Sequence, residues 1–578
     1  MKLKALALDY DGTIAEDGRL NPAVRGALER ARSAGLVVLI VTGRIIGELR
    51  HLAGDLTFAE AVVGENGAVI TFPRSGRSTA LHEPPPPAFL DGLSERGVEF
   101  KCGEVVVEAD ASAAPEALEL IRRLELPLAI LFNRGRMMIL PQAISKATGF
   151  AVALEAFRLS PHNVLAIGDA ENDHELLRSA EVGVAVEWGS AGLQSTADEV
   201  LPGKGPAAVA DYIDAILEGP DTLRSGYPRR RLVLGTTRGG NDVSLAVSGR
   251  NVVISGDPRS GKSWVAGLVC EQLILHGYSL CIVDPEGDYA GLEGLPRVLM
   301  TGGDDPPPKP HELTRLLRYP DRSVILNLSQ LSHLEKLDYL RDILPEITVV
   351  RHNTGLPHRV LVDEAHYFLC DPHAMSLLDV GAGGCTMVTY RASQLHPDVL
   401  QVADVMLVSR ATDPEEVAAL ARAARVSVDL EEWKSLLAGL AVNEVALLPG
   451  PEEAEGRLRI MRLAERLTPH VRHRMKYIDV PVAEHHAFVF SKDGHPLGQR
   501  AHTLKEFVDT LAWMEPKRFH GHLQHRDFSN WIEGVFGDRT LAARIRQLEG
   551  AYRAGRIADI NQAIIEAVQS RYAFSHEA

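Results

Sequence analysis

Short runs of apolar residues alternate with stretches of helical spacing over most of the chain. Among the first 218 residues, strands are expected over 3–8, 37–41 and 163–167, and helices over 22–34 and 173–180. A second series of strands is expected over 251–254, 279–283, 323–328, 359–362, 386–389, 405–408 and 444–448. Strands that alternate with helices are typical of largely parallel sheets. The pattern therefore predicts two successive α/β units.

Breaks in this pattern divide the chain. The interval of about 73–140, which contains four consecutive prolines, is interpreted as an inserted α/β subdomain, and 218–231 as a linker. Beyond 466 the helical spacing over 540–549 and 557–568 predicts a mostly helical end. The expected domains are therefore 1–220 (with the insertion at about 73–140), 221–465 and 466–578.

Composition narrows the class of protein. The 578 residues are 45% hydrophobic, which excludes a mainly disordered chain. A net charge of −16 gives no overall basic footprint, although a local basic groove is compatible with it. Five cysteines without a CxxC pair indicate a reducing compartment. No apolar run reaches the ~18 residues of a membrane span, so we expect a cytoplasmic protein without a membrane partner.

The first α/β unit carries polar residues where expected strands end or helices begin. These residues are Asp9, Asp11, Thr42, Lys146, Asp169 and Asp173. Carboxyl ends of parallel strands share one edge of a sheet, which is where such sheets bind ligands. In this order the residues resemble the motifs of the haloacid dehalogenase (HAD) phosphatases, over about 1–218. The branch with the cap between the second and third motifs is most similar, and it includes Cof-like sugar phosphatases and archaeal phosphoglycolate phosphatases.

The resemblance implies a Rossmann-like domain with an inserted α/β cap and a role for each motif. Asp9 would be the nucleophile that forms an aspartyl phosphate, and Asp11 the general acid and base. Thr42 and Lys146 would hold the transferring phosphoryl group.

The resemblance also implies a Mg²⁺ site, because this cation favours oxygen ligands. Its ligands would be Asp9, Asp169, Asp173 and the backbone carbonyl of Asp11. The opposing interpretation is a decayed domain whose carboxylates only cap loops.

Two arginines of the insertion, Arg134 and Arg136, are candidates for gripping an anionic substrate. The alternative is that both are solvated turn residues.

The second α/β unit contains a phosphate-binding motif. Its candidate nucleotide residues are Gly256, Gly261, Lys262, Ser263 and Asp363, with Glu364 as the candidate general base. The glycine loop follows an expected strand and precedes a helix, the context that a P-loop requires. Lys262 would reach the β- and γ-phosphates of ATP, while Ser263 and Asp363 would complete a Mg²⁺ shell.

The order of motifs over about 232–463 resembles the HerA/FtsK family of hexameric DNA-translocating ATPases. This resemblance implies a RecA-like ATPase domain, a homo-oligomeric ring and DNA or RNA as a partner. Arg391 and Arg410 are candidate arginine fingers, and each could equally make a local salt bridge. Tyr390 stands where the family commonly has a γ-phosphate-sensing glutamine, which is a departure from the pattern.

The region 466–578 resembles no family that we recognise. Basic residues concentrate over 457–476, where they form either a phosphate-binding surface or a solvated face. His520, His522 and His525 lie close in sequence, but their spacing matches no metal-ligand pattern.

Three functions fit these motifs. The first is a bifunctional Mg²⁺-dependent phosphatase and ATP-driven motor that acts on nucleic-acid ends or nucleotides. The second is a small-molecule phosphatase, acting on a sugar or organic phosphate, that a non-translocating ATP-binding domain regulates. In the third, the first domain is only a scaffold for an ATPase assembly.

Overall fold

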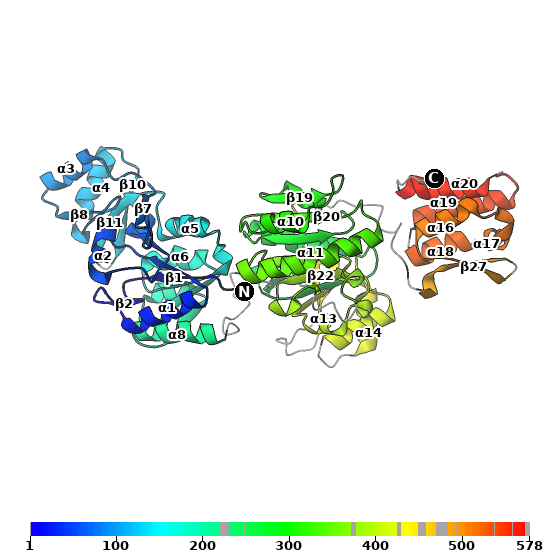
Figure 1. Cartoon of the computed structure of the whole chain (residues 1–578), viewed down its shortest axis with the longest axis horizontal. Coiled ribbons are helices and arrows are strands. Elements are labelled where there is room, and N and C mark those ends of the chain that lie inside the picture. Colours follow the sequence, from blue (N-terminus) through cyan, green and yellow to red (C-terminus); the bar gives the residue numbers. More distant parts are fainter. Residues whose placement is uncertain are drawn as a thin grey trace.

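The computed structural model describes residues 2–133, 135–219, 230–246, 249–370, 377–424, 429–448, 458–469, 482, 484–492, 494–536, 538–557 and 559–572. They form three bodies along the long axis of the molecule, coloured blue to cyan, green to yellow and orange to red in Figure 1. The first two are α/β bodies, as the alternating pattern predicts. The linker expected over 218–231 lies largely outside the described residues.

The first body is built on an eight-stranded sheet with the order β14-β13-β12-β1-β4-β5-β6-β7. Its strands are β1 Ala5–Asp9, β4 Val37–Val41, β5 Ala61–Gly64, β6 Val69–Phe72, β7 Arg77–Ala80, β12 Val164–Gly168, β13 Val182–Val186 and β14 Glu199–Leu201. The central strand β1 is wholly buried and pairs in parallel with both β12 and β4. The three strands expected from the sequence are confirmed within one or two residues.

Six helices accompany this sheet: α1 Pro22–Ser33, α2 Ile46–Ala53, α5 Lys146–Phe157, α6 His174–Ser179, α7 Ala191–Thr196 and α8 Pro206–Glu218. In α1 the Asn21 side chain caps the first turn, and Pro22 occupies the first helical position. Val24, Ala27, Leu28 and Ala31 are buried at helical spacing, so one face of α1 packs on the sheet. A short ribbon, β2 Ala15–Glu16 and β3 Arg19–Leu20, follows β1.

The insertion is a separate four-stranded antiparallel sheet, with the order β10-β11-β9-β8. Its elements are α3 Pro87–Glu95, β8 Phe100–Cys102, β9 Val107–Asp110, α4 Ala114–Arg123, β10 Leu128–Asn133 and β11 Arg136–Pro141. The expected start near residue 73 is too early, because β7 still pairs with β6 in the main sheet. This cap therefore begins after Ala80, and it ends at about the residue expected.

The central body is an eleven-stranded sheet with the order β16-β15-β25-β24-β23-β17-β22-β21-β18-β20-β19. Its strands are β15 Arg231–Thr237, β16 Asp242–Ala246, β17 Val252–Ser255, β18 Leu280–Asp284, β19 Val298–Gly302, β20 Ser323–Asn327, β21 Arg359–Val362, β22 Cys385–Thr389, β23 Val405–Val408, β24 Glu444–Leu447 and β25 Arg459–Leu463. All seven expected strands are confirmed. The sequence pattern missed β15, β16, β19 and β25, which lie toward the two ends of the sheet.

Helices lie between many of the successive strands of this sheet. They are α9 Lys262–Leu275, α10 Pro310–Leu316, α11 His333–Thr354, α13 Pro397–Gln401, α14 Pro414–Ala423 and α15 Leu430–Ala438. The strand that leads into α9, β17, is buried and pairs in parallel with β22 and β23.

The third body combines a hairpin with helices. Its elements are β26 Phe488–Lys492, β27 His495–Ala501, α16 Leu504–Trp513, α17 His520–His525, α18 Asp527–Phe536, α19 Arg539–Arg553 and α20 Ile560–Tyr572. Its core is rich in aromatic residues, including Phe488, Phe490, Phe507 and Phe528. In the part of the chain that the structure describes, no helix is long and apolar enough to cross a membrane.

The first two bodies meet through residues that precede their strands. Asn163, just before β12, donates to the carbonyl of Gly355 (3.4 Å). Glu181, just before β13, accepts a hydrogen bond of 2.9 Å from the hydroxyl of Tyr278, which precedes β18. The two sheets therefore contact each other at their amino edges.

Candidate active site

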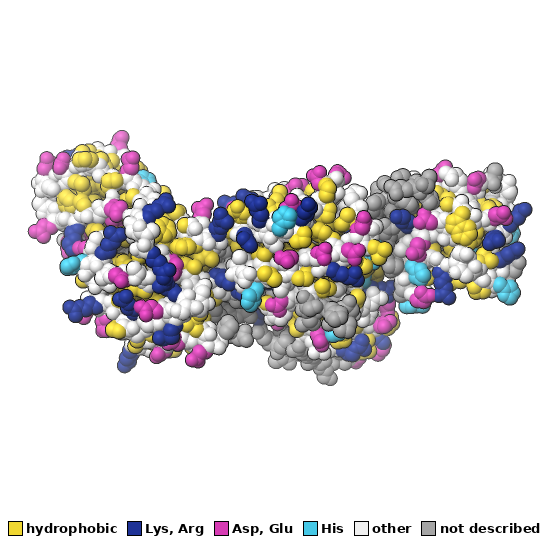
Figure 2. Space-filling model, in the orientation of Figure 1, with side chains coloured by type: hydrophobic (Ala, Val, Ile, Leu, Met, Phe, Trp, Pro, Cys, Tyr) yellow, Lys and Arg dark blue, Asp and Glu magenta, His cyan; other side chains and the backbone are white. Residues whose placement is uncertain are grey.

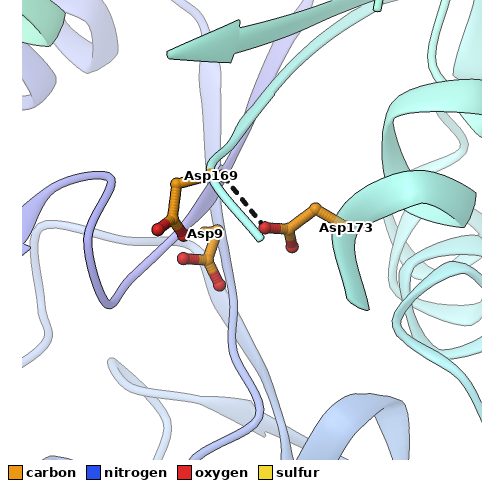
Figure 3. Close-up of side chains that lie close together, drawn as sticks. All are labelled: Asp9, Asp169 and Asp173. Carbon is orange, nitrogen blue, oxygen red and sulfur yellow. Dashed lines mark hydrogen bonds between the residues drawn. The ribbon is translucent and has the colours of Figure 1, made fainter. Parts of the chain in front are cut away.

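Three buried carboxylates converge at the carboxyl edge of the first sheet. Asp9 is the last residue of β1, and Asp169 directly follows β12. Asp173 lies in the next turn, and its Oδ2 accepts from the backbone N–H of Asp169 at 3.1 Å (Figure 3). An oxygen of each carboxylate lies within 4.8 Å of the other two. The structure thus brings together three of the expected metal ligands, and their hard oxygen donors suit Mg²⁺.

Lys146 is the cation that this cluster contacts. It is the first residue of α5, where Ser145 caps the helix. Its buried Nζ donates to Oδ1 of Asp9 and to Oδ1 of Asp173, both at 2.6 Å. Burial alone would lower the pKa of Lys146, but the carboxylates of Asp173 and Asp9 outweigh it and raise the pKa. Burial and the charge of Asp173 raise the pKa of Asp9 well above its usual range.

Asp11 lies beyond the end of β1 and is held by a partner that the sequence did not single out. The Nε and Nη2 atoms of Arg44 each donate to one of its carboxylate oxygens at 2.6 Å. Arg44 is itself positioned by Thr42, whose Oγ1 accepts from the Arg44 backbone N–H at 3.1 Å. Both carboxylate oxygens of Asp11 are thus occupied as acceptors of one guanidinium.

A cavity of about 600 Å³ opens over these residues. The main domain contributes Asp9, Asp11, Thr42, Arg44, Lys146 and Asp169 to its lining, and the cap contributes Lys101, Glu108, Arg136 and Met138. Arg136 pairs with Glu108, and Lys101 donates to Glu48 at 2.5 Å. The structure therefore places Arg136 at the cavity rather than in an isolated turn. Arg134 lies outside the described residues.

Glu65 ties the cap to the main domain, a role that its sequence context does not signal. Its carboxylate is buried and accepts from the backbone N–H groups of Glu104 (2.9 Å), Val105 (2.9 Å) and Val106 (3.0 Å). Those residues form the turn between β8 and β9. One carboxylate thereby fixes the cap over the cavity.

The glycine loop of the central body lies between β17 and α9. Gly256 and Gly261 have φ values of +146° and +104°, which side chains rarely adopt. The Lys262 Nζ donates to the carbonyl of Asp257 at 2.8 Å, inside the loop's own turn. Ser263 Oγ donates to Oδ2 of Asp288 at 2.8 Å. The strand–loop–helix context expected for a P-loop is therefore present.

Asp288, which accepts from Ser263, lies in the turn that follows β18. Asp284 ends β18, and its carboxylate accepts from the N–H groups of Gly287 (2.7 Å), Asp288 (3.0 Å) and Tyr289 (3.0 Å). This compact turn directs Asp288 toward Ser263. Burial and the charge of Asp288 raise the pKa of Asp284 to about 7.

Asp363 and Glu364 lie directly after β21, which is two strands from β17 in the sheet, and both are buried. Oδ1 of Asp363 accepts from the N–H of Glu364 at 2.8 Å. His366 Nδ1 lies 3.6 Å from Oε2 of Glu364 and 3.0 Å from the hydroxyl of Thr389. Tyr390 also belongs to this group, because the Lys262 ammonium lies 5.8 Å from its ring centroid.

The two candidate arginine fingers have contacts within the chain. Arg391 stacks on Tyr390 (5.4 Å) and donates to Nδ1 of His486 at 3.5 Å. The guanidinium of Arg410 lies 3.9 Å from the Asp257 carboxylate. Their expected action on a neighbouring subunit stays a prediction.

The remaining sequence candidates do not form a site in the described part of the chain. His522 bonds to Asp527 and to Ser491, whereas His520 bonds to Tyr552. Of the basic stretch 457–476, the structure describes residues 458–469, including Arg459, Arg462 and Arg466, whereas 457 and 470–476 lie outside the described residues.

The chain is similar to proteins of known families. Residues 6–119 and 121–213 match the model of the haloacid dehalogenase-like hydrolases. A phosphoglycolate phosphatase of Methanoculleus marisnigri is 30% identical over 213 residues, which are 34% of this chain and 90% of the relative. A second, of Methanosarcina acetivorans, is 26% identical over 232 residues, 39% of this chain and 98% of the relative. The crystal structure of a haloacid dehalogenase-like hydrolase from Bacteroides thetaiotaomicron is 18% identical, covers 37% of this chain and 100% of its own, and has a TM-score of 0.33.

Proposed function

The chain belongs to the haloacid dehalogenase-like hydrolases, and on that premise we propose that its first domain removes phosphate from a small phosphorylated acid. The observation that carries this proposal is the position of Asp9. Its carboxylate lies at the floor of a cavity of about 600 Å³, beside Lys146 and two further buried carboxylates. A nucleophile and its charge-neutralising partner thus face a space large enough for a small substrate.

In the first step an oxygen of Asp9 attacks phosphorus, and the bond from phosphorus to the ester oxygen breaks. Lys146 contacts Oδ1 of Asp9 at 2.6 Å, so it orients the carboxylate and offsets its charge. The leaving oxygen takes a proton from Asp11. In the second step Asp11 accepts a proton from water, whose oxygen displaces Asp9 from phosphorus and releases inorganic phosphate.

Arg44 controls when Asp11 can act. Asp11 accepts from both nitrogens of the guanidinium. It has to leave them and take up a proton from solvent before it can pass that proton to the ester oxygen. An incoming phosphate competes for the same nitrogens, because guanidinium binds phosphate and carboxylate in the same bidentate manner. Substrate binding therefore supplies the exchange that releases Asp11.

The carboxylates of Asp9, Asp169 and Asp173 fit a Mg²⁺ ion, with the Asp11 carbonyl as the expected backbone ligand. Three buried carboxylates with one lysine leave excess negative charge, and burial together with the charge of Asp173 raises the pKa of Asp9. When bound, the ion would supply positive charge for the phosphoryl oxygens.

The cap residues support an acidic substrate. Lys101 and Arg136 reach the cavity from the cap, and each is paired with a glutamate of the lining. A substrate carboxylate could replace Glu108 as the hydrogen-bond acceptor of the Arg136 guanidinium. The relatives are named for phosphoglycolate, a compound with one phosphate and one carboxylate group.

A substrate screen tests this function. We expect Mg²⁺-dependent release of phosphate from small phosphorylated acids, and its loss in Asp9→Asn, because an amide cannot attack phosphorus. Arg136→Ala should raise KM for the acids much more than for 4-nitrophenyl phosphate. Phosphorylated oligonucleotides are tested in the same screen. If the enzyme prefers them, the proposed substrate becomes a nucleic-acid end instead of a small acid. Full activity of Asp9→Asn would remove the assignment of the nucleophile.

We propose further that the central body is a P-loop ATPase. The loop before α9, the Ser263–Asp288 pair and the adjacent Asp363 and Glu364 support it. Ser263 and Asp363 suit a Mg²⁺ shell, Gly256 and Gly261 leave space for phosphates, and Glu364 suits a general base. Lys262→Ala should abolish ATP hydrolysis while a folded protein still hydrolyses small phosphate esters.

A homo-oligomeric ring, most simply a hexamer, goes with this proposal, because an arginine finger acts on the neighbouring subunit. Arg391 and Arg410 are its candidates. Specific ATPase activity should therefore rise with protein concentration and fall in Arg391→Ala. A monomer in light scattering, with constant specific activity, would contradict the ring.

A further inference from the structure

A groove of about 1060 Å³ runs between the first and central bodies, away from both sites described above. The first body contributes the end of α5 and the segment that follows, including Glu155 and Arg158. The central body contributes residues that precede its strands, among them Arg297, Tyr319 and Arg322. We propose that this groove binds a strand of nucleic acid through its phosphates.

Two arginines from different bodies converge on one ring in this groove. The guanidinium carbon of Arg158 lies 5.5 Å from the centroid of Tyr319, and that of Arg322 lies 4.5 Å from it. Both side chains are exposed. No carboxylate of the described residues lies within 4.0 Å of either guanidinium, by contrast with Arg44 on Asp11. Two like charges held together at the surface form a site for an anion.

The rest of the charged lining is balanced, so the excess positive charge of the groove is that of Arg158 and Arg322. Arg230 and Arg297 also line the groove, whereas Glu155 and Asp321 are its acidic lining residues. Asp321 lies 3.8 Å from Arg297, in an exposed pair that contributes little to stability. A group of Lys and Arg side chains is visible on the surface between the places of α5 and α10 in Figure 1 (Figure 2). In a chain with a net charge of −16, this local excess of positive charge indicates an anionic partner.

The form of the site favours a nucleic-acid strand over a small phosphate. A small anion is usually held by buried, converging donors, as in the cavity above Asp9. Here the arginines are exposed and distributed over two bodies, so a linear polyanion contacts more of them than one phosphate can. The groove also lies on the amino edges of both sheets, where it serves neither reaction as a substrate pocket. This inference does not depend on the phosphatase reaction.

Fluorescence anisotropy with a labelled oligothymidylate of about 20 nucleotides tests the groove. Matched DNA, RNA and duplex probes show which kind of strand it accepts, and titrations from about 50 to about 200 mM salt give the charge dependence. The key variant is Arg158→Ala/Arg322→Ala. Its control, Arg122→Ala/Arg341→Ala, removes the same charge from exposed positions of the same two bodies.

We expect the groove variant to bind about tenfold more weakly and its salt slope to fall by about 1.4, the value for two lost single-strand contacts. Arg158→Lys/Arg322→Lys should retain most of the binding, because it keeps the charges. Thermal melting and size exclusion verify that each variant is folded. The proposal is overturned if the wild type binds no probe, if both alanine doubles lose affinity equally, or if inorganic phosphate competes as well as the oligonucleotide. Hydrolysis of small esters without nucleic acid is measured separately, so its failure would refute only the proposed phosphatase.

Discussion

Glu65→Gln is the sharpest test of how the cap is held over the active site. Glu65 is fully buried, and its two carboxylate oxygens accept three backbone N–H groups of residues 104–106. A hydrogen bond to a charged group contributes about 1.5 to 3 kcal/mol, and an unmatched buried donor costs about 1 to 3 kcal/mol. Glutamine keeps the volume but turns an NH₂ group toward these donors, so the turn should lose about 2 kcal/mol. Glu65→Ala should lose more, about 3 to 5 kcal/mol, because no acceptor remains.

Hydrogen exchange measures this loss locally, which matters because a chain of several domains does not unfold in two states. A loss of about 2 kcal/mol corresponds to roughly 30-fold faster exchange of amides 104–106. KM for small phosphate esters should rise with it, because Lys101 and Arg136 are carried by the same cap. Glu104→Gln is the matched control, since Glu104 is exposed on the same turn. Wild-type exchange of these amides in Glu65→Gln would refute the anchoring role.

Three further predictions concern the buried charges and the glycine loop. Lys146→Met leaves Asp9 and Asp173 without the ammonium group that they share. It should therefore reduce kcat by at least about 10²-fold and lower the melting temperature, most strongly in EDTA. An unchanged melting temperature in EDTA would contradict this. Burial lowers the pKa of His358 to about 3, so the stability that neutral His358 contributes is complete above about pH 6.5 and falls by about 1.4 kcal/mol per unit as the pH drops toward 3. His358→Gln should flatten this acid limb in urea titrations, and an identical limb would exclude His358 as its source. Gly256→Ala places a Cβ 2.1 Å from Ser409 Oγ, so nucleotide-dependent stabilisation in thermal shift assays should disappear, and its persistence would show that the loop tolerates a side chain.

The sequence predicts the strand-end residues well because their position follows from topology alone. Asp9 and Asp169 end or follow strands that pair in parallel with a common register, so they meet without any further assumption. The same holds for the loop after β17 and for Asp363 after β21. In each case the apolar run and the order of the strands suffice, because these strands consist mainly of apolar residues.

Contacts that depend on side-chain direction could not be predicted. Arg44 and Asp11 are 33 positions apart in the sequence, and only the structure shows that the guanidinium of Arg44 faces the carboxylate of Asp11. Glu65 is equally hidden, because a buried glutamate in a turn has no sequence pattern. The late start of the cap has a similar cause: β7 is exposed along most of its length, so its residues resemble a loop although they extend the main sheet.

The contact between the first two bodies limits how the two proposed reactions can be coupled. Asn163 and Glu181 precede β12 and β13, and their partners Gly355 and Tyr278 precede β21 and β18. Both sheets therefore present their amino edges to the contact, while Asp9 and Lys262 lie at the opposite, carboxyl edges. A phosphorylated product cannot pass directly between the sites, so coupling has to travel through the bodies or through a bound strand. The groove that Arg158 and Arg322 share lies along this contact, so a single ligand bound there would touch both bodies.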